Sequence, residues 1–399
     1  MQHVQYAIRE LYPIAEKIEA SGGSIAKVNI GDPVPYFGTP RYVLVAYAKA
    51  VLAGKTHYGR SPGETEFQKA IADRYARLYR TGLDPQDIFV THGVSEAFAF
   101  LNTCLMEEGR GCIMLSPYYS ADLPLVLERG GKAYFAECDE SKGWGLDLGK
   151  LERCLRHAKQ DGRRIEFLSV INPCNPTGAV FGRSDLEALA AFAREHELLL
   201  VSDETYDEIV FDKSEGPFVS MCEVARDQPL AVMNGLSKNW AGTGMRIGWL
   251  ALTGAGGKMD ALRDGLSRLA TVRLCAGVAQ QHAGVEALNN TAEHKKFISH
   301  FTAEVGKRSK QFCTRLNEVQ GISCVPAKGA FYLFPKVDLA AANCKTDSEF
   351  VRLLLEEQHV WAVQGSGFGC GGHIRVVTLP PLEIIDRACD GIAKMMKTG

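Results

Sequence analysis

Short apolar runs alternate with longer amphipathic stretches through the middle of the chain, between about residues 85 and 250. Apolar runs of about four to eight residues are typical of buried strands, and apolar positions that recur every three or four residues are typical of helices. The alternation predicts an α/β fold, with a mainly parallel sheet of seven strands between helices. The expected strands are Ile88–Thr91, Cys112–Ser116, Lys132–Ala136, Ile165–Ile171, Leu198–Ser202, Ala231–Asn234 and Gly248–Leu252. The expected helices include Ser95–Glu107, Arg183–His196 and Lys258–Leu269.

A different pattern begins near residue 290. From Ala292 to about Val319, apolar residues at helical spacing in a charged stretch predict one long helix that joins two lobes. The first forty or so residues, punctuated by glycines and prolines, are expected to pack on the later lobe. The sequence predicts a large domain over residues 41–290 and a smaller α+β domain made of residues 1–40 and 291–399, because 399 residues exceed what one core usually supports. The smaller domain's expected strands are Gly329–Pro335 and His373–Thr378, and its expected helices are Ser348–Gln358 and Leu382–Met396.

The composition favours small-molecule chemistry over large anionic partners. A formal net charge of -2 and 23% charged residues lack the concentrated basic charge of proteins that bind nucleic acid or anionic membrane surfaces. No apolar run approaches the roughly 20 residues of a membrane span, and the N-terminus lacks a basic-then-apolar signal pattern. We therefore expect a cytoplasmic protein without a nucleic-acid or membrane partner.

The 12 cysteines are scattered along the chain and include no Cys-x-x-Cys pair. A chain of this length needs no disulfide framework, so the cysteines are expected to be reduced and mostly buried. No metal is expected in the functional site.

Four motifs follow expected strands between residues 172 and 249. Taken singly, each has an ordinary structural explanation: Asp203 could cap a helix, Lys238 could be a solvated surface lysine, and Arg246 could pair with a local acid. Together they place an acid, a lysine and an arginine at strand ends, where open α/β sheets bind ligands. The motifs are Asn-Pro-Cys-Asn-Pro-Thr-Gly from Asn172, Asp-Glu-Thr-Tyr from Asp203, Gly-Leu-Ser-Lys from Gly235, and Gly-Thr-Gly-Met-Arg-Ile-Gly-Trp from Gly242.

The combination suits pyridoxal phosphate. A lysine at the end of an apolar run can be desolvated, which lowers its pKa and frees the amine to form an imine with a carbonyl cofactor. A buried carboxylate such as Asp203 can hold the proton on the cofactor's ring nitrogen. Ser237 and Arg246 can bind the phosphate. The strand-to-helix turn Thr91-His92-Gly93-Val94-Ser95 offers helix N-terminal amides to the same anion, although a routine capped helix explains that turn equally well.

These motifs, in this order, resemble the class I/II aminotransferases, the fold-type I pyridoxal-phosphate enzymes, over nearly the whole chain. The resemblance implies pyridoxal 5'-phosphate as cofactor, an amino acid and a 2-oxo acid as substrates, and a homodimer with active sites at the subunit interface. It also implies Lys238 as the Schiff-base lysine and catalytic base, with Asp203 and Tyr206 as further catalytic residues. Asn175 and Tyr206 would hydrogen-bond the ring's phenolic oxygen, and Tyr119 would stack on the ring. The phosphate would be held by Val94, Ser95, Ser237, Arg246 and the neighbouring subunit's Tyr58.

The resemblance also implies a substrate site. Arg375 would form a bidentate salt bridge with the substrate α-carboxylate, which fixes the orientation of the carboxylate as well as its position. Considered alone, Arg375 could instead make an ordinary strand-end salt bridge. Gly31 and Asn175 would line the same pocket. Local strings around Tyr6, Arg273 and Val363 are similar to the bacterial alanine-transaminase branch. In that branch Tyr6, Arg9 and Tyr119 would close over the substrate side chain and favour small amino acids, whereas Arg9 could equally be a surface residue.

Two segments depart from the family pattern, the glycine-rich stretch 365–372 and the small-residue stretch 241–244, and they bear on the substrate. The main alternative is another pyridoxal-phosphate reaction on the same scaffold, such as an elimination, a cyclisation or a natural-product tailoring step, or a transaminase with aspartate or aromatic preference. A ligand-sensing or regulatory protein that uses the fold without turnover is disfavoured, because the sequence shows no appended basic DNA-binding segment and the catalytic set is intact. A nucleotide-binding oxidoreductase is disfavoured because Gly367 to Gly372 matches Gly-x-Gly-x-x-Gly but leads into an expected strand.

Overall fold

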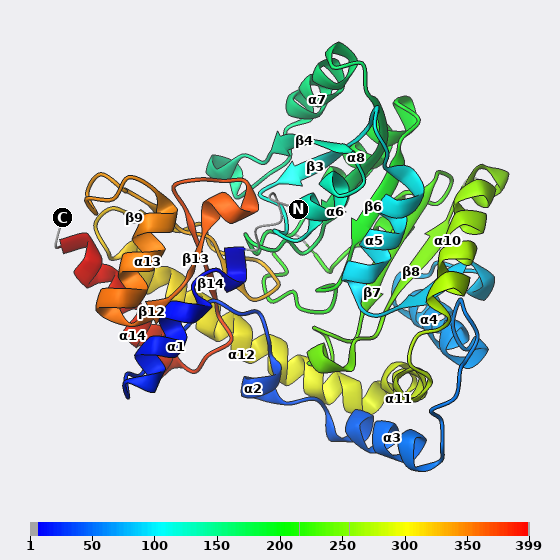
Figure 1. Ribbon diagram of the computed structural model, residues 1–399, viewed down its shortest axis with the longest axis horizontal. Helices are drawn as coiled ribbons and strands as arrows, with labels where there is room; N and C mark the ends of the chain where they lie inside the picture. Colours follow the sequence, from blue (N-terminus) through cyan, green and yellow to red (C-terminus); the bar gives the residue numbers. More distant parts are fainter. Residues whose placement is uncertain (1–6, 215, 255, 398–399) are drawn as a thin grey trace.

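The computed structural model describes residues 7–214, 216–254 and 256–397 (Figure 1). Within these residues, seven strands form a central sheet in the order β2-β8-β7-β6-β5-β3-β4. Neighbouring strands from β7 to β4 are parallel, and β8 is antiparallel to both β7 and β2. The predicted α/β fold with a mainly parallel sheet is confirmed. The strands are β2 Ile88–Thr91, β3 Arg110–Ser116, β4 Lys132–Glu137, β5 Arg164–Ile171, β6 Leu199–Asp203, β7 Leu230–Gly235 and β8 Gly248–Thr253.

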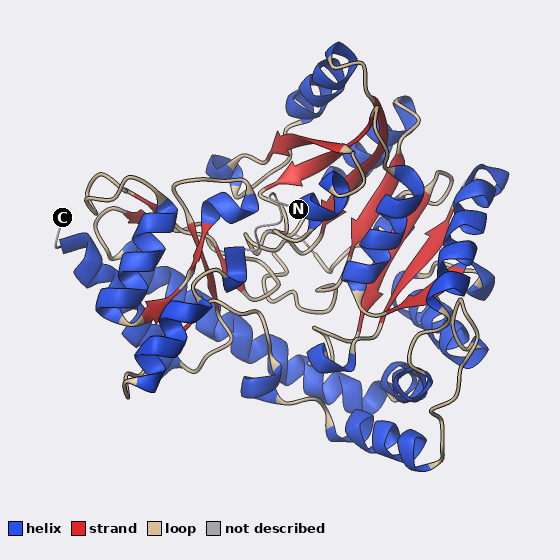
Figure 2. Cartoon of the chain, in the orientation of Figure 1, coloured by secondary structure: helices blue, strands red, loops and turns tan. Residues whose placement is uncertain are grey.

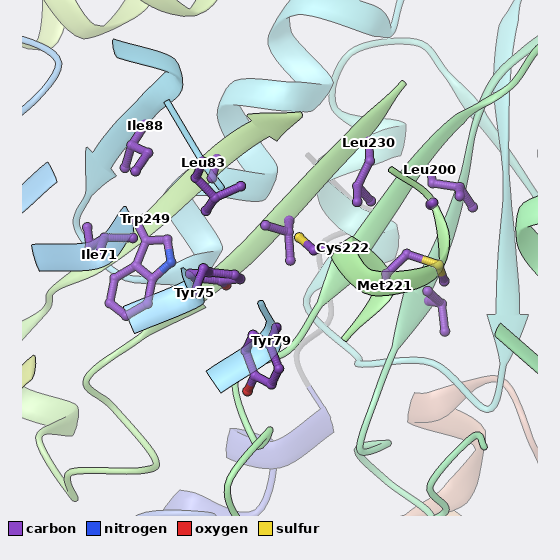
Figure 3. Packing of buried hydrophobic residues seen from close by; sticks show 14 of the residues in the cluster. Ile71, Tyr75, Tyr79, Leu83, Ile88, Leu200, Met221, Cys222, Leu230 and Trp249 are labelled. Atoms are coloured by element: carbon purple, nitrogen blue, oxygen red, sulfur yellow. The ribbon is translucent and has the colours of Figure 1, made fainter. Parts of the chain in front are cut away.

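Helices cover both faces of this sheet, as the blue and red elements of Figure 2 show. Successive residues of a strand point to opposite faces, so Leu200 and Leu230 pack in one buried cluster and Leu199 and Ala231 in another. Figure 3 shows part of the first cluster, where Trp249 of β8 lies against helix α4. The first cluster includes residues of α4 Thr65–Tyr79, α7 Leu148–Gln160, α8 Arg183–Glu195 and α11 Val278–Asn289, and the second includes residues of α5 Val94–Leu105, α6 Asp122–Leu127 and α10 Asp260–Arg273.

A second lobe surrounds its own buried cluster beside the sheet. Its small sheet has the order β10-β14-β13. Helix α12, yellow in Figure 1, runs from beside α11 into this lobe, and its 27 residues agree with the long helix expected there. The elements are β9 Ile322–Ser323, β10 Tyr332–Leu333, β11 Lys336–Val337, β12 Val360–Trp361, β13 Val363–Gln364, β14 Ile374–Val377, α12 Thr291–Asn317, α13 Asp347–Gln358 and α14 Leu382–Lys397.

The N-terminal segment lies on this second lobe. Strand β1 (Ala26–Lys27) pairs in parallel with β12, and the Val28 amide donates to the Trp361 carbonyl at 3.1 Å. The domain limits at residues 40 and 290 stay a prediction. The remaining helices are η1 Ala7–Arg9, α1 Tyr12–Ala20, α2 Val34–Phe37, α3 Arg41–Leu52 and α9 Met221–Val224, and the remaining 3-10 turns are Pro85–Asp87, Glu140–Lys142, Thr243–Met245, Gly256–Met259 and Gly365–Phe368.

The strand expected over Gly329–Pro335 was wrong in extent, because only Tyr332–Leu333 forms β10. Gly329 bridges to Val210, and the Ala330 amide donates to the Ile209 carbonyl at 2.8 Å. These backbone groups therefore bind the loop that follows β6 instead of a strand of the small sheet. Apolar composition alone does not distinguish the two partners.

None of the helices in the described ranges is long and apolar enough to cross a membrane.

Candidate active site

A cavity of about 540 Å³ opens at the carboxyl ends of β5, β6 and β7, within the size range of small-molecule sites. Both lobes contribute to its wall. The lining residues are Ile8, Arg9, Ile30, Gly31, Asp32, Val94, Ser95, Phe98, Tyr119, Asp122, Ser169, Ile171, Asn175, Asp203, Thr205, Tyr206, Met233, Ser237, Lys238, Thr243, Gly244, Arg246, Tyr332 and Arg375.

Lys238 occupies a tight turn that follows β7. The turn is closed by backbone bonds from the Ala241 amide to the Lys238 carbonyl at 3.1 Å and from the Gly242 amide to the Leu236 carbonyl at 3.0 Å. Lys238 Nζ donates to the Gly31 carbonyl at 2.7 Å. Burial lowers the pKa of Lys238 to about 8, assisted by nearby arginines and opposed by nearby carboxylates. About a tenth of this amine is therefore unprotonated at pH 7 and about half at pH 8, and the free amine is the form that a nucleophile or base requires.

Asp203 ends β6 and lines the cavity beside Lys238. Its Oδ1 accepts hydrogen bonds from the Thr205 hydroxyl and from the Thr205 amide, the latter at 3.0 Å. Burial raises the pKa of Asp203, while the bonds from Thr205 and the charge of Lys238 act in the opposite direction. A buried carboxylate of this kind favours a protonated nitrogen in front of it.

An anion cradle lies where α5 begins. The first amides of α5, at Val94 and Ser95, have no carbonyl within their own helix to bind, so they point outward with the positive end of the helix dipole. The guanidinium of Arg246 donates to the His92 carbonyl at 3.1 Å and lies 3.4 Å from Ser237 Oγ. A Cβ at Gly93, whose φ is +82°, would come within 2.3 Å of this guanidinium. The missing side chain therefore lets the arginine reach the helix N-terminus.

Arg375 presents a second cation from β14 on the other lobe. It is 1% exposed, donates to Asn175 Oδ1 at 3.1 Å and to the Asn29 carbonyl at 2.5 Å, and lies between the rings of Tyr332 and Phe368, at 4.9 and 4.7 Å. Its Nε is buried without a hydrogen-bond partner, and within the described ranges no carboxylate forms an ion pair with it. A guanidinium held in this way suits a planar carboxylate from outside the chain.

The remaining predicted residues fall in different places. Tyr206 and Tyr119 line the cavity, and the Tyr206 hydroxyl is 2.8 Å from the Tyr332 hydroxyl. Arg9, on η1, is exposed and lies at the cavity wall. Tyr58 is 80% exposed and does not line the cavity of its own chain. Tyr6 lies outside the described residues.

The structure adds residues that the sequence reasoning missed. Asp32 lines the cavity and accepts from Thr243 Oγ1 at 2.8 Å, which connects the N-terminal segment to the small-residue stretch 241–244. Tyr332 and Asp122 also line the cavity. Thr205 could have been found from its position two residues after Asp203, a spacing typical of local carboxylate-to-backbone turns. No local sequence signal marks Asp32, Tyr332 or Asp122.

Comparisons with known proteins agree with this arrangement of amine, carboxylate and two arginines. Residues 27–392 match the family described as aminotransferase class I and II. The chain belongs to this family. It is 34% identical over 385 residues to the alanine aminotransferase of Mycobacterium tuberculosis, covering 95% of this chain and 87% of that protein. It is 32% identical over 400 residues to the glutamate-pyruvate aminotransferase AlaA of Escherichia coli, covering 99% and 96%. The structure of an alanine aminotransferase from Pyrococcus furiosus superimposes with a TM-score of 0.93 at 35% identity, covering 100% and 98%.

The predictions of a fold-type I aminotransferase and of pyridoxal 5'-phosphate as its cofactor are thereby confirmed. The residues of this aminotransferase fit that cofactor. The cavity offers an amine with a lowered pKa for the aldehyde, a buried carboxylate for the ring nitrogen, and the helix N-terminus with Arg246 for the phosphate.

The lowered pKa predicts an unusual pH dependence for the reactivity of Lys238. Only the free amine reacts with acylating reagents, so labelling of Lys238 in the cofactor-free aminotransferase should follow a titration with a midpoint at about pH 8. Labelling of exposed lysines in the same sample should keep rising toward pH 10. Pulse labelling from pH 6 to pH 10, read by peptide mass spectrometry, measures both. A Lys238 profile that parallels the exposed lysines would contradict this environment.

Proposed function

We propose that this aminotransferase moves the amino group of alanine, or of another small amino acid, to a 2-oxo acid such as pyruvate or 2-oxoglutarate. The observation that carries the proposal is the meeting of three groups in one cavity: the Lys238 amine, the Asp203 carboxylate and the Arg375 guanidinium. The named activities of the Mycobacterium tuberculosis and Escherichia coli relatives support alanine and glutamate as amino donors.

The residue roles follow from the chemistry of each group. When bound, pyridoxal 5'-phosphate supplies an aldehyde that exchanges amino groups and a pyridinium ring that accepts the electron pair of the substrate's Cα–H bond. Asp203 would hold the proton on the ring nitrogen by charge pairing. Asn175 and Tyr206 would donate hydrogen bonds to the phenolic oxygen, and Tyr119 would pack on the ring. Val94, Ser95, Ser237 and Arg246 would bind the phosphate.

Lys238 would have two tasks. Its Nζ would bind the cofactor between turnovers, and once displaced by the substrate it would take the proton from the substrate Cα and return it as an acid. Arg375 would hold the substrate α-carboxylate with Asn175 and Gly31 beside it, which directs the Cα–H bond toward the lysine. Because the same site returns the amino group to a second substrate, ping-pong kinetics are expected.

The substrate side chain would face the N-terminal segment. Buried Ile8 anchors η1, so the exposed Arg9 next to it can extend over the cavity. In this proposal Arg9, Tyr6 and Tyr119 close over a small side chain, and the Arg9 guanidinium pairs with the distal carboxylate of glutamate or 2-oxoglutarate.

A homodimer is part of the proposal. Tyr58 is exposed and does not line the cavity of its own chain. Exposed apolar residues occur on α3 and α10, including Leu52 at 88% and Val272 at 84% exposed. A second copy that covers such residues could receive the Tyr58 hydroxyl at its phosphate site. The cytoplasmic location stays a prediction.

Replacement of the lysine tests the reaction. Lys238→Arg should lose the absorbance of the lysine-bound cofactor and lower kcat at least about 10⁴-fold, because the guanidinium is neither a nucleophile nor a base near neutral pH. The exposed Lys142→Arg is the matched control. The assay measures pyruvate and glutamate formed from alanine and 2-oxoglutarate. Pyruvate without an equal amount of glutamate would indicate an elimination, and turnover retained in Lys238→Arg would contradict the assignment.

Replacement of Arg9 tests substrate selection. Arg9→Ala should lower kcat/KM for glutamate about tenfold or more, because it loses a charge-assisted hydrogen bond, while kcat/KM for alanine changes by less than about threefold. Arg9→Lys retains the charge and should lower kcat/KM for glutamate less than Arg9→Ala does. Equal losses for both amino acids would exclude the proposed pairing with the distal carboxylate.

The dimer is tested by light scattering together with Tyr58→Phe. The aminotransferase should scatter as two chains, and removal of the hydroxyl should weaken cofactor binding about tenfold in equilibrium titrations. A fully active monomer would overturn both the dimer and the role of Tyr58.

A further inference from the structure

A closed ring of buried side chains lies behind the Lys238 turn, outside the cavity. None of its members lines the cavity among the described residues, so the roles proposed above do not use them. The ring consists of Arg74 on α4, Asp207 and Glu208 in the loop after β6, Asn239 and Trp240 next to Lys238, and His294 on α12.

One half of the ring ties the lysine turn to Asp207. Asn239 Nδ2 donates to Asp207 Oδ1 at 2.5 Å. The other oxygen, Asp207 Oδ2, accepts from Arg74 Nη2 at 2.8 Å and from the Tyr79 hydroxyl. A carboxylate only accepts hydrogen bonds, so the orientation of the Asn239 amide is determined by its partner. Tyr79 and Tyr75 of this region are visible in Figure 3.

The other half returns to the residue after Asn239. Arg74 Nη2 also donates to Glu208 Oε2 at 2.9 Å, and His294 Nε2 lies 2.9 Å from the same oxygen. The His294 ring stacks on Trp240, with centroids 4.3 Å apart and planes at 20°. The ring of contacts therefore closes at the lysine turn, where it began.

The ring pairs opposite charges in a largely buried setting. The side chains of Arg74 and Asp207 are 1% and 0% exposed. Although burial acts to raise it, Arg74 and His294 lower the pKa of Glu208 to about 2, so Glu208 is ionised. Each bonded group would leave its partner unpaired in a nonpolar environment if it moved, which favours the observed positions. Within the part of the chain that the structure describes, three atoms of the ring, Arg74 Nη1, Asn239 Oδ1 and His294 Nδ1, are buried without a hydrogen-bond partner.

The position of this ring bears on Lys238. Among the residues that the structure describes, Lys238 Nζ makes one hydrogen bond, to the Gly31 carbonyl. Its backbone lies in a turn whose next residue, Asn239, is tied to Asp207, and Asp207 belongs to the same loop as Tyr206, four residues after Asp203. The bond between Asn239 and Asp207 therefore connects the lysine turn to the loop that follows the carboxylate at the end of β6.

We propose that Asp207 and Asn239 are positioning residues for Lys238: their hydrogen bond, braced by Arg74 and Tyr79, fixes the lysine turn against the loop that carries Asp203 and Tyr206. This inference rests on the proposed role of Lys238 in binding the cofactor. Neither residue touches the cavity, so their effect passes through the lysine.

The test uses Asn239→Ala in the full-length aminotransferase. Loss of the hydrogen bond between Asn239 and Asp207 lets the lysine turn shift. A shift of about 1 Å can lower the rate of a step that needs an aligned nucleophile by about 10²-fold. We expect the cofactor-free variant to capture added pyridoxal 5'-phosphate at least about tenfold more slowly, followed as the absorbance of the lysine-bound cofactor. The kcat of the variant should fall by a similar factor, and its KM for the amino acid should stay within about threefold of the value for the unaltered protein.

A matched control separates positioning from general destabilisation. Asn317→Ala removes an exposed side-chain amide of the second lobe, whose Nδ2 donates to the Cys324 carbonyl at 2.9 Å and whose Oδ1 accepts from the Cys324 amide at 2.8 Å. It should lower Tm, because two hydrogen bonds to the backbone are lost, and leave the capture rate unchanged. If Asn239→Ala does not fold, Tyr79→Phe decides, because it removes one brace of Asp207 without altering the turn: a capture rate lowered at least about twofold supports the inference.

The outcomes distinguish this inference from the proposed function. If the unaltered protein forms no lysine-bound cofactor, or Lys238→Arg still forms it, the role of Lys238 fails. If the unaltered protein captures the cofactor through Lys238 and folded Asn239→Ala captures it at the same rate, only the positioning role is overturned. The same holds for an unchanged rate in Tyr79→Phe when Asn239→Ala does not fold.

Discussion

The site depends on an amine and a carboxylate that are kept together out of water. Strands β6 and β7 are parallel neighbours, with Asp203 paired in register with Met233, so their carboxyl ends open on the same side of the sheet about 4.8 Å apart. Asp203 ends one strand and the Lys238 turn follows the other. Burial then acts on the two groups in opposite directions, because it lowers the pKa of the amine and raises that of the carboxylate. The lowered pKa prepares the lysine for nucleophilic attack, whereas a cationic partner would offset the cost of burying the charged form of the carboxylate.

The second lobe completes this chemistry from across the cavity. Arg375 and Tyr332 come from its small sheet, and Gly31 comes from the N-terminal segment that pairs with β12. The Lys238 Nζ bond to the Gly31 carbonyl connects the two lobes at the reacting atom. Arg9 and Asp32 also reach the cavity from the N-terminal segment, so in the proposed function the selection of the substrate side chain depends on the same meeting of lobes.

The polar ring behind the lysine illustrates how the fold stabilises this arrangement. Buried ion pairs contribute little net stability when compared with well-packed apolar residues. Arg74, Asp207 and Glu208 nevertheless lie where α4, the loop after β6 and the first turns of α12 meet. The hydrogen bonds at this junction hold the lysine turn in one position, because they are directional and apolar packing is not.

Much of this could be predicted from the sequence. Strand positions follow from local apolar runs, so all seven strands of the central sheet appear within a few residues of their expected places. Lys238, Asp203, Asn175 and Arg246 were identified because short motifs place them just beyond strands. Other features depend on contacts between distant segments. Arg74 meets Asp207 from 133 residues away and Arg375 meets Asn175 from 200, and no local pattern encodes such pairs. The short extent of β10 and the approach of Asp32 and Tyr332 to the cavity likewise depend on how the lobes dock. Local periodicity and motif spacing thus determined the sheet and its reactive residues, whereas long-range packing decided how those residues are held and which substrate side chain they face.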